Sequence, residues 1–333
     1  MKAVVRHAPL PIDDPASLQD TTLPDPGPGP RDLLVRVEAV SVNPVDTKVR
    51  RNAPADGPKV LGWDAAGVVE AVGADVTLFQ PGDRVWYAGD LTRPGSNAER
   101  QVVDARIAGR MPATLDFAQA AALPLTAITA WELLFDRLSV EADTTGTLLV
   151  VGAAGGVGSI LVQLARQLTR LTVVGTASRP ETREWVRGLG AHHVIDHARP
   201  LTEGLKAAGV PSVAYVASLT HTDAHYAEIV AALAPQGKLA LIDDPAAPLD
   251  LMALKRKSAS IHWEFMFTRS MFQTPDIQAQ HDLLQRVAAL VDAGTLRTTV
   301  GERFGTINAA NLRRAHALLE SGRARGKIVL AGF

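Results

Sequence analysis

Short apolar runs separated by turn residues fill the first third of the chain. Such runs lie at residues 2–7, 32–41, 67–72 and 99–103, and a turn leads into another run over residues 80–86. Glycine and proline are densest over residues 23–30, between two predicted strands, which indicates an ordered loop. Many short strands with such turns are typical of a β-rich barrel or sandwich, so we predict a domain of that kind.

The chain becomes rich in alanine and leucine from Asp116 onward. This composition predicts helix over residues 117–134, broken at Pro124, and we place a domain junction near Leu123. Beyond the junction, apolar strands alternate with amphipathic helices, as in the doubly wound parallel sheet of an α/β domain. We expect strands at residues 148–151, 172–175, 193–195, 212–216 and 238–242, and helices at 159–170, 181–189, 201–208 and 223–233.

The alternating pattern stops after Ile242. An aromatic strand is expected at residues 263–267, a helix at 278–293 and a closing strand at 327–330. At 333 residues the chain exceeds the ~250–300 over which one hydrophobic core can grow, so two domains are expected. We predict that residues 1–122 and 264–333 form one domain, and that residues 123–263 form a second domain inserted into it.

A glycine-rich stretch opens the second domain. Residues 148–159 read Leu-Leu-Val-Val-Gly-Ala-Ala-Gly-Gly-Val-Gly-Ser. A strand-to-helix turn of this kind lets the backbone approach a diphosphate, which the N–H groups of the helix N-terminus bind. The match to G-x-G-x-x-G is partial, because the three fingerprint positions hold Ala153, Gly155 and Gly158. We expect the diphosphate of a dinucleotide to contact Ala153, Ala154, Gly155, Gly156 and Val157; the alternative is an ordinary glycine-rich turn.

Composition and charge exclude several classes of protein. The formal net charge is −1, and no basic run points to nucleic acid or a membrane surface. The chain has no cysteine, which excludes disulfides and thiolate metal sites. No stretch approaches the ~18 uninterrupted apolar residues of a membrane span, and the first residues lack the apolar core of a signal peptide. We therefore expect a cytoplasmic globular protein.

Five separate motifs give the chain a resemblance to a known family. They are residues 42–47 (Val-Asn-Pro-Val-Asp-Thr), 62–70 (Gly-Trp-Asp-Ala-Ala-Gly-Val-Val-Glu), 81–85 (Pro-Gly-Asp-Arg-Val), 123–130 (Leu-Pro-Leu-Thr-Ala-Ile-Thr-Ala) and 153–158 (Ala-Ala-Gly-Gly-Val-Gly). With these five motifs in this order, the chain resembles a medium-chain dehydrogenase/reductase. Within that superfamily it is most similar to the zinc-free quinone oxidoreductase branch. The resemblance implies a GroES-like catalytic domain around an inserted Rossmann domain, hydride transfer with a nicotinamide cofactor, and a homodimer.

The resemblance also identifies where zinc would be bound in alcohol dehydrogenases. Those enzymes have a thiolate where this chain has Asp46, and a histidine where it has Trp63. The four-cysteine lobe of a structural zinc site cannot form without cysteine. We predict no functional zinc, although Asp46 and Asp64 could bind a stray cation.

The cofactor is predicted from the segment after the second strand of the inserted domain. Residues 176–180 read Thr-Ala-Ser-Arg-Pro and lack the acidic residue that is typical of NAD enzymes. Ser178 and Arg179 offer a donor and a cation to a 2′-phosphate, so we expect NADPH; the alternative is a solvated basic helix start. The resemblance adds Thr129 beside the nicotinamide and further contacts from His197, Ser218, Leu219, Asp243, Phe265 and Phe267. Core packing is the alternative for Thr129 and the two phenylalanines.

Without a metal as Lewis acid, oxyanion charge must be stabilised by hydrogen-bond donors, which favours acceptors with delocalised product anions. Quinones and α,β-unsaturated carbonyls are such acceptors. The residues implied for this chemistry are Asn43, Asp46, Thr47, Lys48, Trp63 and Asp64. Relatives often have a tyrosine in place of Lys48, so protonation is expected from solvent or from Lys48. Alternatively, Asn43 and Asp46 are turn residues that bond their own backbone.

The leading hypothesis is an NADPH-dependent oxidoreductase that reduces quinones or enones. Two alternatives stay open: an alcohol or aldehyde dehydrogenase, and an NADPH-binding protein of weak catalytic activity. The histidines at positions 221 and 225 are interpreted as exposed residues at a helix start and not as metal ligands.

Overall fold

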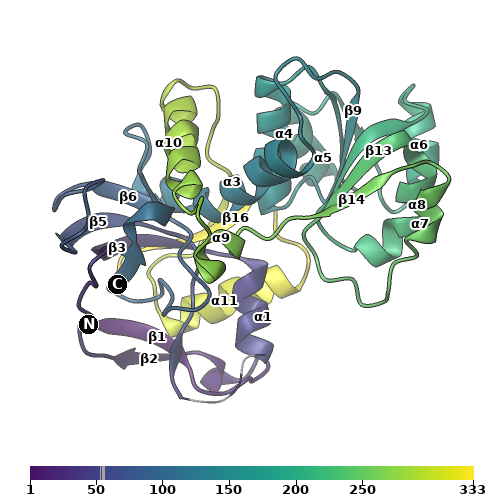
Figure 1. The fold of residues 1–333 in the computed structure, drawn as a ribbon. Helices are drawn as coiled ribbons and strands as arrows, with labels where there is room; N and C mark the ends of the chain where they lie inside the picture. The colour runs from purple at the N-terminus through teal and green to yellow at the C-terminus, as the bar shows by residue number, and fades with distance from the viewer. Residues whose placement is uncertain (53, 55–56) are drawn as a thin grey trace. The chain divides into compact units, whose positions relative to one another are not determined.

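The structure is a computed structural model that describes residues 1–333 except 53, 55 and 56. It divides into two compact units: unit 1 comprises Met1–Ile128 and Phe267–Phe333, and unit 2 comprises Thr129–Met266 (Figure 1). The first boundary lies within the helix α3 (Pro124–Trp131), beyond the junction placed at Leu123. A helix that runs through a boundary carries no linker composition, so the sequence pattern cannot locate the boundary to the residue.

Unit 1 is built mainly on antiparallel strands. Its larger sheet has the order β15-β16-β3-β5-β6-β8, and β7 pairs with β3. A smaller sheet has the order β2-β1-β4. These sheets confirm the predicted β-rich domain. The strands are β1 (Lys2–Arg6), β2 (Gln19–Thr22), β3 (Asp32–Val42), β4 (Lys59–Val60), β5 (Ala65–Val72), β6 (Arg84–Tyr87), β7 (Arg100–Asp104), β8 (Ala108–Arg110), β15 (Val300–Arg303) and β16 (Lys327–Ala331).

The strand β3 organises the larger sheet. Leu33, Val35 and Val37 are buried, while Arg36 between them is exposed, so one face of the strand contributes to the core. Its far end pairs antiparallel with β16, with Ile328 opposite Val42. This register brings the last strand of the chain against the segment that leads from β3 into α1.

Helices cover the sheets of unit 1. Along α10, Leu283, Leu284, Val287 and Val291 are buried, so one face of this helix contributes to the core. The helices are α1 (Pro44–Asn52), α2 (Phe117–Ala121), α9 (Thr268–Phe272), α10 (Ala279–Asp292) and α11 (Ala309–Glu320), with short 3₁₀ turns η1 (Pro15–Ser17) and η2 (Ala105–Ile107).

His316 is a buried imidazole on α11, beside Arg50 on α1. Neither ring nitrogen has a hydrogen-bond partner among the described residues. Burial, with the nearby guanidinium, lowers the pKa of His316 to about 3, against 6.5 for an ordinary histidine. Below pH 6.5, His316 therefore binds a proton in the unfolded chain but stays neutral in the folded chain. The free energy of unfolding falls as the pH drops from 6.5 towards 3.

The wild type loses stability between pH 7 and pH 5. We expect this loss to be smaller by about 2 kcal/mol in the variant His316→Leu. Denaturant unfolding at both pH values measures this difference. The exposed His7, replaced by glutamine, is the matched control and should leave the pH dependence unchanged. A wild-type protein whose stability depends on pH no more steeply than that of the His316 variant would contradict the assignment.

Unit 2 contains a parallel sheet of order β11-β10-β9-β12-β13-β14. Its strands alternate with helices, which confirms the predicted doubly wound α/β fold. The order reverses direction at β9, where the glycine-rich turn follows. The strands are β9 (Thr147–Val151), β10 (Thr172–Thr176), β11 (His193–Ile195), β12 (Val213–Ser218), β13 (Leu233–Leu241) and β14 (Ser260–Trp263), and the helices are α4 (Gly156–Leu168), α5 (Pro180–Gly188), α6 (Leu201–Ala207), α7 (Thr222–Ala232) and α8 (Met252–Lys255).

Two local predictions are wrong. The aromatic strand expected over residues 263–267 ends at Trp263 and pairs with β13 of unit 2, because pairing and not aromatic content decides where a strand stops. The helix expected from residue 159 begins at Gly156, since Gly155 caps it. The helix after Pro124 passes into a π-helical turn, η3 (Glu132–Arg137), which no local pattern indicated.

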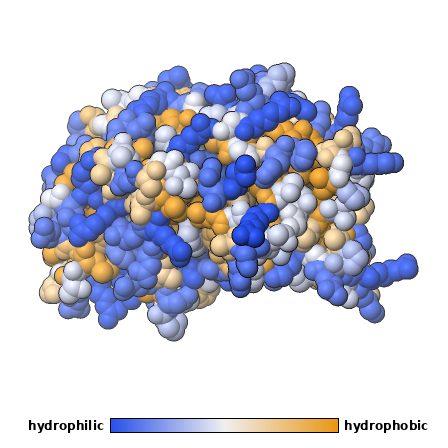
Figure 2. Space-filling model, turned by 90° about the horizontal axis from the view of Figure 1, so that it is seen from above, coloured by the Kyte–Doolittle hydropathy of each residue, from blue (hydrophilic) through white to orange (hydrophobic). Residues whose placement is uncertain are grey.

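Residues Phe117–Arg137 are long and apolar enough to cross a membrane by length and composition, but 83% of the most apolar window is buried inside the fold. A core helix meets the same criterion. Figure 2 shows a face covered mainly by hydrophilic side chains, with smaller hydrophobic patches between them.

Candidate functional site

A buried cluster of polar side chains lies where β3 leads into α1 in unit 1. Lys327, the first residue of β16, is 3% exposed, and its Nζ atom lies 2.9 Å from Asp64 Oδ2. The same nitrogen donates to Val42 O at 3.1 Å and to Asn43 Oδ1. These acceptors use all three donors of the ammonium group, so Lys327 holds the cluster together.

Asp64 is fully buried and accepts hydrogen bonds on both carboxylate oxygens. Oδ2 accepts from Asn43 Nδ2 at 2.9 Å and from Ser41 Oγ at 3.2 Å, besides Lys327. Oδ1 accepts from the backbone N–H of Leu125 at 2.8 Å. Burial raises the pKa of Asp64, while the Lys327 ammonium and these donors oppose the rise.

The bond to Leu125 links the cluster to the helix α3. Leu125 lies in the first turn of α3, where backbone N–H groups have no partner within the helix. Asp64 supplies the acceptor and the negative charge that a helix N-terminus favours. Thr129 follows four residues later on the same helix face and is 5% exposed. Asp64 therefore positions the helix that carries Thr129.

Asn43 and Asp46 cap the first turn of α1. The backbone N–H of Asn43 donates to Asp46 Oδ2, and the backbone N–H of Asp46 donates to Asn43 O at 3.0 Å. Pro44 begins the helix, a position that suits its fixed φ angle. The side-chain amide of Asn43 also donates to Trp63 O at 3.2 Å. Its donors are therefore engaged inside the chain, as the alternative interpretation of these residues expects.

Asp46 differs from Asp64 because only one of its two carboxylate oxygens accepts a hydrogen bond from a described residue. Oδ1 of Asp46 is buried, and no described residue forms a hydrogen bond with it. Burial raises the pKa of Asp46 to about 7; the Asn43 N–H and the Lys327 ammonium oppose this rise, and the neighbouring Asp64 adds to it. Asp46 can therefore hold or release a proton near neutral pH.

The other predicted catalytic residues lie around this cluster. Trp63 is 3% exposed, and its indole Nε1 donates to Asp90 O at 3.2 Å. Thr47 Oγ1 donates to Pro44 O at 2.9 Å. Lys48 is half-buried on α1. The structure thus brings Asn43, Asp46, Trp63 and Asp64 together, with Lys48 on the same helix as Asp46.

The side chains at this place do not form a set of zinc ligands. Zinc sites combine thiolate, imidazole and carboxylate ligands, and the chain has no cysteine. The indole of Trp63 is only a donor, and the carboxylate of Asp64 is paired with an ammonium group. Within the part of the chain that the structure describes, no group of three or more His, Asp or Glu side chains could hold a metal ion.

The glycine-rich turn of unit 2 joins β9 to α4. Gly152 has a φ angle of 83°, in the left-handed region that favours glycine. A Cβ atom added to Gly158 would lie 2.5 Å from Gly152 O and 2.6 Å from Ala153 Cα. The missing side chain therefore allows the helix to approach the end of the strand closely. The N–H groups of the first turn of α4 lie at the reversal of the strand order, which fits the diphosphate of a dinucleotide.

Ser178 and Arg179 follow β10 after the buried Ala177 and are partly exposed. Arg179 is the N-cap residue of α5, and its Nε atom lies 3.3 Å from Glu181 Oε1. The guanidinium of Arg183 donates to Val194 O at 3.3 Å, so it is tied to the backbone. Ser178 and Arg179 are thus the residues of this segment that could meet a 2′-phosphate.

Ser218 and Asp243 take part in a cap on α7. The hydroxyl of fully buried Ser218 lies 2.7 Å from Thr222 Oγ1, and Asp243 Oδ2 accepts from Thr222 N at 2.9 Å. Both side chains are therefore engaged with Thr222.

Leu219 and His197 also follow strands of the parallel sheet. Leu219 Cβ would lie 3.6 Å from a Cβ atom on Gly152, which places it beside the glycine-rich turn. The His197 ring packs edge-on against His225, with 6.1 Å between centroids. His225 is consequently half-buried, and the prediction that it is exposed is wrong.

The two phenylalanines have different surroundings. Phe265 lies beyond the end of β14 and is 48% exposed, whereas Phe267 is 3% exposed at the start of α9 in unit 1. The packing of Phe267 is that of a core residue.

Sequence reasoning missed Lys327 and Leu125 as members of the cluster. Lys327 opens an otherwise apolar strand, Lys-Ile-Val-Leu, and a lysine at a strand end is usually exposed. Leu125 contributes only its backbone N–H, which no side-chain pattern reveals. The signal that could have found it is an N-terminal helix turn without a capping side chain after Leu123-Pro124.

Two family models match parts of the chain. The model of alcohol dehydrogenase GroES-like domains matches residues 29–115, and the model of zinc-binding dehydrogenases matches residues 189–330. A solved structure from Rhizobium etli CFN 42, provisionally named a zinc-dependent alcohol dehydrogenase, is 60% identical, with a TM-score of 0.96 over 100% of this chain and 98% of that one.

Two further proteins carry a different name. A quinone oxidoreductase of Pseudomonas aeruginosa is 35% identical over 91% of this chain and 92% of its own length. The Escherichia coli quinone oxidoreductase, solved in complex with NADPH, is 25% identical, with a TM-score of 0.85 over 99% of this chain and 100% of that one.

Proposed function

Since this chain belongs to the medium-chain dehydrogenase/reductase superfamily, we propose that it is an NADPH-dependent oxidoreductase that transfers hydride to quinones or α,β-unsaturated carbonyls without a catalytic zinc. The likeness to quinone oxidoreductases of two organisms supports the choice of acceptor. The Escherichia coli quinone oxidoreductase was solved in complex with NADPH, which supports the choice of cofactor.

The observation that carries the proposal is the buried Asn43–Asp64–Lys327 cluster. Zinc in an alcohol dehydrogenase polarises the substrate oxygen as a Lewis acid. Here the corresponding residues are Asp46 and Trp63, and a lysine ammonium neutralises Asp64. These side chains suit an acceptor that needs little stabilisation of oxyanion charge, which is the property of quinones and enones.

The cofactor, when bound, supplies the hydride. The backbone N–H groups of the turn from Ala153 to Val157 would bind its diphosphate, and Ser178 and Arg179 would meet the 2′-phosphate. Asp64 holds Leu125 N–H and so orients the helix that carries Thr129. Asp46, whose pKa burial raises to about 7, could hold or release a proton at its buried Oδ1, which has no hydrogen-bond partner among the described residues.

Purified protein is expected to oxidise NADPH with quinones or enones, and a chelator is expected to leave this rate unchanged. The measurement is NADPH absorbance over a panel of quinones, enones and aldehydes, each with and without 1,10-phenanthroline. Turnover confined to alcohols and aldehydes, lost with the chelator and restored by Zn²⁺, would sink the proposal and favour a zinc-dependent alcohol dehydrogenase. NADPH binding without turnover would also reject it.

Arg179→Ala is expected to lower the preference for NADPH over NADH, expressed as the ratio of kcat/KM values, by about tenfold or more. The reason is that a charge-assisted hydrogen bond to a phosphate contributes about 1.5–3 kcal/mol. Arg187→Ala, at an exposed position on the same helix, is the matched control. An unchanged ratio in the Arg179 variant would remove this residue from the phosphate site.

A further inference from the structure

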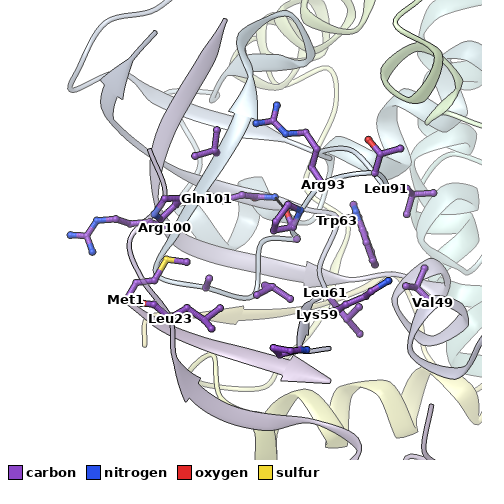
Figure 3. A pocket seen from close by; sticks show the side chains of 18 of the residues that line it. Met1, Leu23, Val49, Lys59, Leu61, Trp63, Leu91, Arg93, Arg100 and Gln101 are labelled. Atoms are coloured by element: carbon purple, nitrogen blue, oxygen red, sulfur yellow. Dashed lines mark hydrogen bonds between the residues drawn. The ribbon is translucent and has the colours of Figure 1, made fainter. Parts of the chain in front are cut away.

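A pocket of about 600 Å³ lies within unit 1. It extends from Leu23 at one end to Val49 and Leu91 at the other, with Trp63 near this second end (Figure 3). Binding sites for small molecules typically have volumes of about 300–1,000 Å³. The pocket therefore has room for a small organic ligand, and no proposed step of hydride transfer uses most of its lining.

The lining is mostly apolar. Aliphatic and proline side chains come from three segments that are distant in sequence: Leu23, Pro24, Pro26, Val60, Leu61 and Leu91. The indole N–H of Trp63 is engaged with Asp90 O at 3.2 Å. Such walls favour a ligand with a flat apolar body, for which an aromatic neighbour is a good packing partner.

The two arginines of the lining carry their own counter-ions. Arg93 binds Asp32 through two hydrogen bonds of 2.8 and 3.0 Å. Arg100 Nε donates to Glu70 Oε2 at 2.7 Å. Because both guanidinium groups are paired within the chain, neither offers an uncompensated charge to an anion, and a neutral ligand suits the part of the pocket beside them.

One buried polar atom of the lining lacks a partner. Gln101 is 4% exposed, and its Nε2 donates to Pro94 O at 3.0 Å, which fixes the orientation of the amide. No described residue donates a hydrogen bond to its Oε1. A Cβ atom on Gly89 would lie 3.6 Å from Gln101 Nε2 and 3.8 Å from Trp63 Cδ1, so the amide and the indole are neighbours. A buried acceptor in such a place gains from a donor on the ligand.

We propose that this pocket binds a neutral, mainly apolar aromatic molecule with one hydroxyl donor, of the phenol class. The hydroxyl donates to Gln101 Oε1, and the ring packs among the aliphatic side chains beside Trp63. Binding needs neither the cofactor nor turnover, because every residue of the pocket belongs to unit 1. The proposal therefore stands or falls separately from the proposed reaction.

The test is calorimetric titration of the full chain, without cofactor, with 4-propylphenol and with 4-propylanisole. The methyl ether has nearly the same shape but no donor. The phenol is expected to bind about fivefold more tightly, the usual effect of one neutral hydrogen bond. Gln101→Leu should abolish this preference. Leu91→Trp places a bulky ring at the end of the pocket near Trp63 and should weaken binding of both compounds at least tenfold.

Leu251→Trp, at an exposed position in unit 2, is the matched control and should bind the phenol as the wild type does. Circular dichroism shows whether each variant is folded. Leu91→Trp tests the site independently if Gln101→Leu does not fold. Three results overturn the proposal: no binding of the phenol, equal affinity for the two compounds in the wild type, or phenol binding that Leu91→Trp leaves unchanged.

Discussion

Lys327→Met is expected to lower the free energy of unfolding by about 3–5 kcal/mol. The substitution removes the ammonium group from a fully buried carboxylate, Asp64, and leaves Asn43 Oδ1 and Val42 O without their donor. Each of these groups then bears a desolvation cost that the wild type does not have. Denaturant unfolding at neutral pH, followed by circular dichroism, measures the loss.

The pH dependence of this loss separates a charge effect from lost packing. Without the ammonium, burial keeps the pKa of Asp64 raised with less opposition, so the folded variant binds a proton more readily than the unfolded chain. A raised pKa in the folded state contributes stability at low pH that is lost as the pH rises. We therefore expect the defect of Lys327→Met to be smaller at pH 5 than at pH 8.

Two controls accompany this prediction. Lys206→Met, at an exposed position on α6, should change stability by less than about 0.5 kcal/mol. The double variant Asp64→Asn with Lys327→Met should lose less stability than the two single variants together. Each single variant leaves one buried charge unpaired, whereas the double variant leaves none. A Lys327 variant as stable as the Lys206 variant would show that the ion pair is not what holds the cluster.

Gly158→Ala is expected to destabilise unit 2 by about 1–3 kcal/mol and to weaken NADPH binding at least tenfold. The added methyl group would lie 2.5 Å from Gly152 O and 2.6 Å from Ala153 Cα, and both are backbone atoms that cannot move aside alone. The turn must open, and the N–H groups of α4 then leave the position that suits a diphosphate. Thermal melting and fluorescence titration with NADPH measure the two effects.

The variant Gly155→Ala separates an effect on stability from an effect on NADPH binding. Gly155 has a φ of −73°, and the nearest atom to its added Cβ is Gly152 O at 3.5 Å, an ordinary contact. We expect its stability to stay near that of the wild type, while the methyl group keeps the diphosphate from the backbone and weakens NADPH binding. If both glycine variants bind NADPH as the wild type does, the diphosphate is not bound at this turn.

Much of the fold follows from local pattern. The parallel strands of unit 2 are short, buried runs between amphipathic helices, so each element leaves its own signal in the sequence. The strand at 193–195 is predicted to the residue, and α10 differs from its prediction by one residue at each end. The aromatic segment after β14 is mispredicted, because the end of that strand depends on its pairing with β13.

The chemistry of the cluster depends on contacts between distant segments. Asp46 has the same sequence signal whether it caps a helix or exchanges a proton, and burial of Oδ1 is what gives it the second capacity. Lys327 reaches Asn43 only because Ile328 pairs with Val42 in the sheet. The local sequence around either strand does not predict this register.

The sequence by itself determined the β-rich domain, the inserted parallel sheet and the glycine-rich turn, since each depends on the periodicity and conformational freedom of neighbouring residues. The tertiary structure alone decided which polar groups share a buried space. It joined Lys327, Asp64 and Leu125 into one network and left Gln101 Oε1 in a pocket without a donor. The physical reason is that burial and long-range hydrogen bonding depend on how strands pair and pack, which no local pattern specifies.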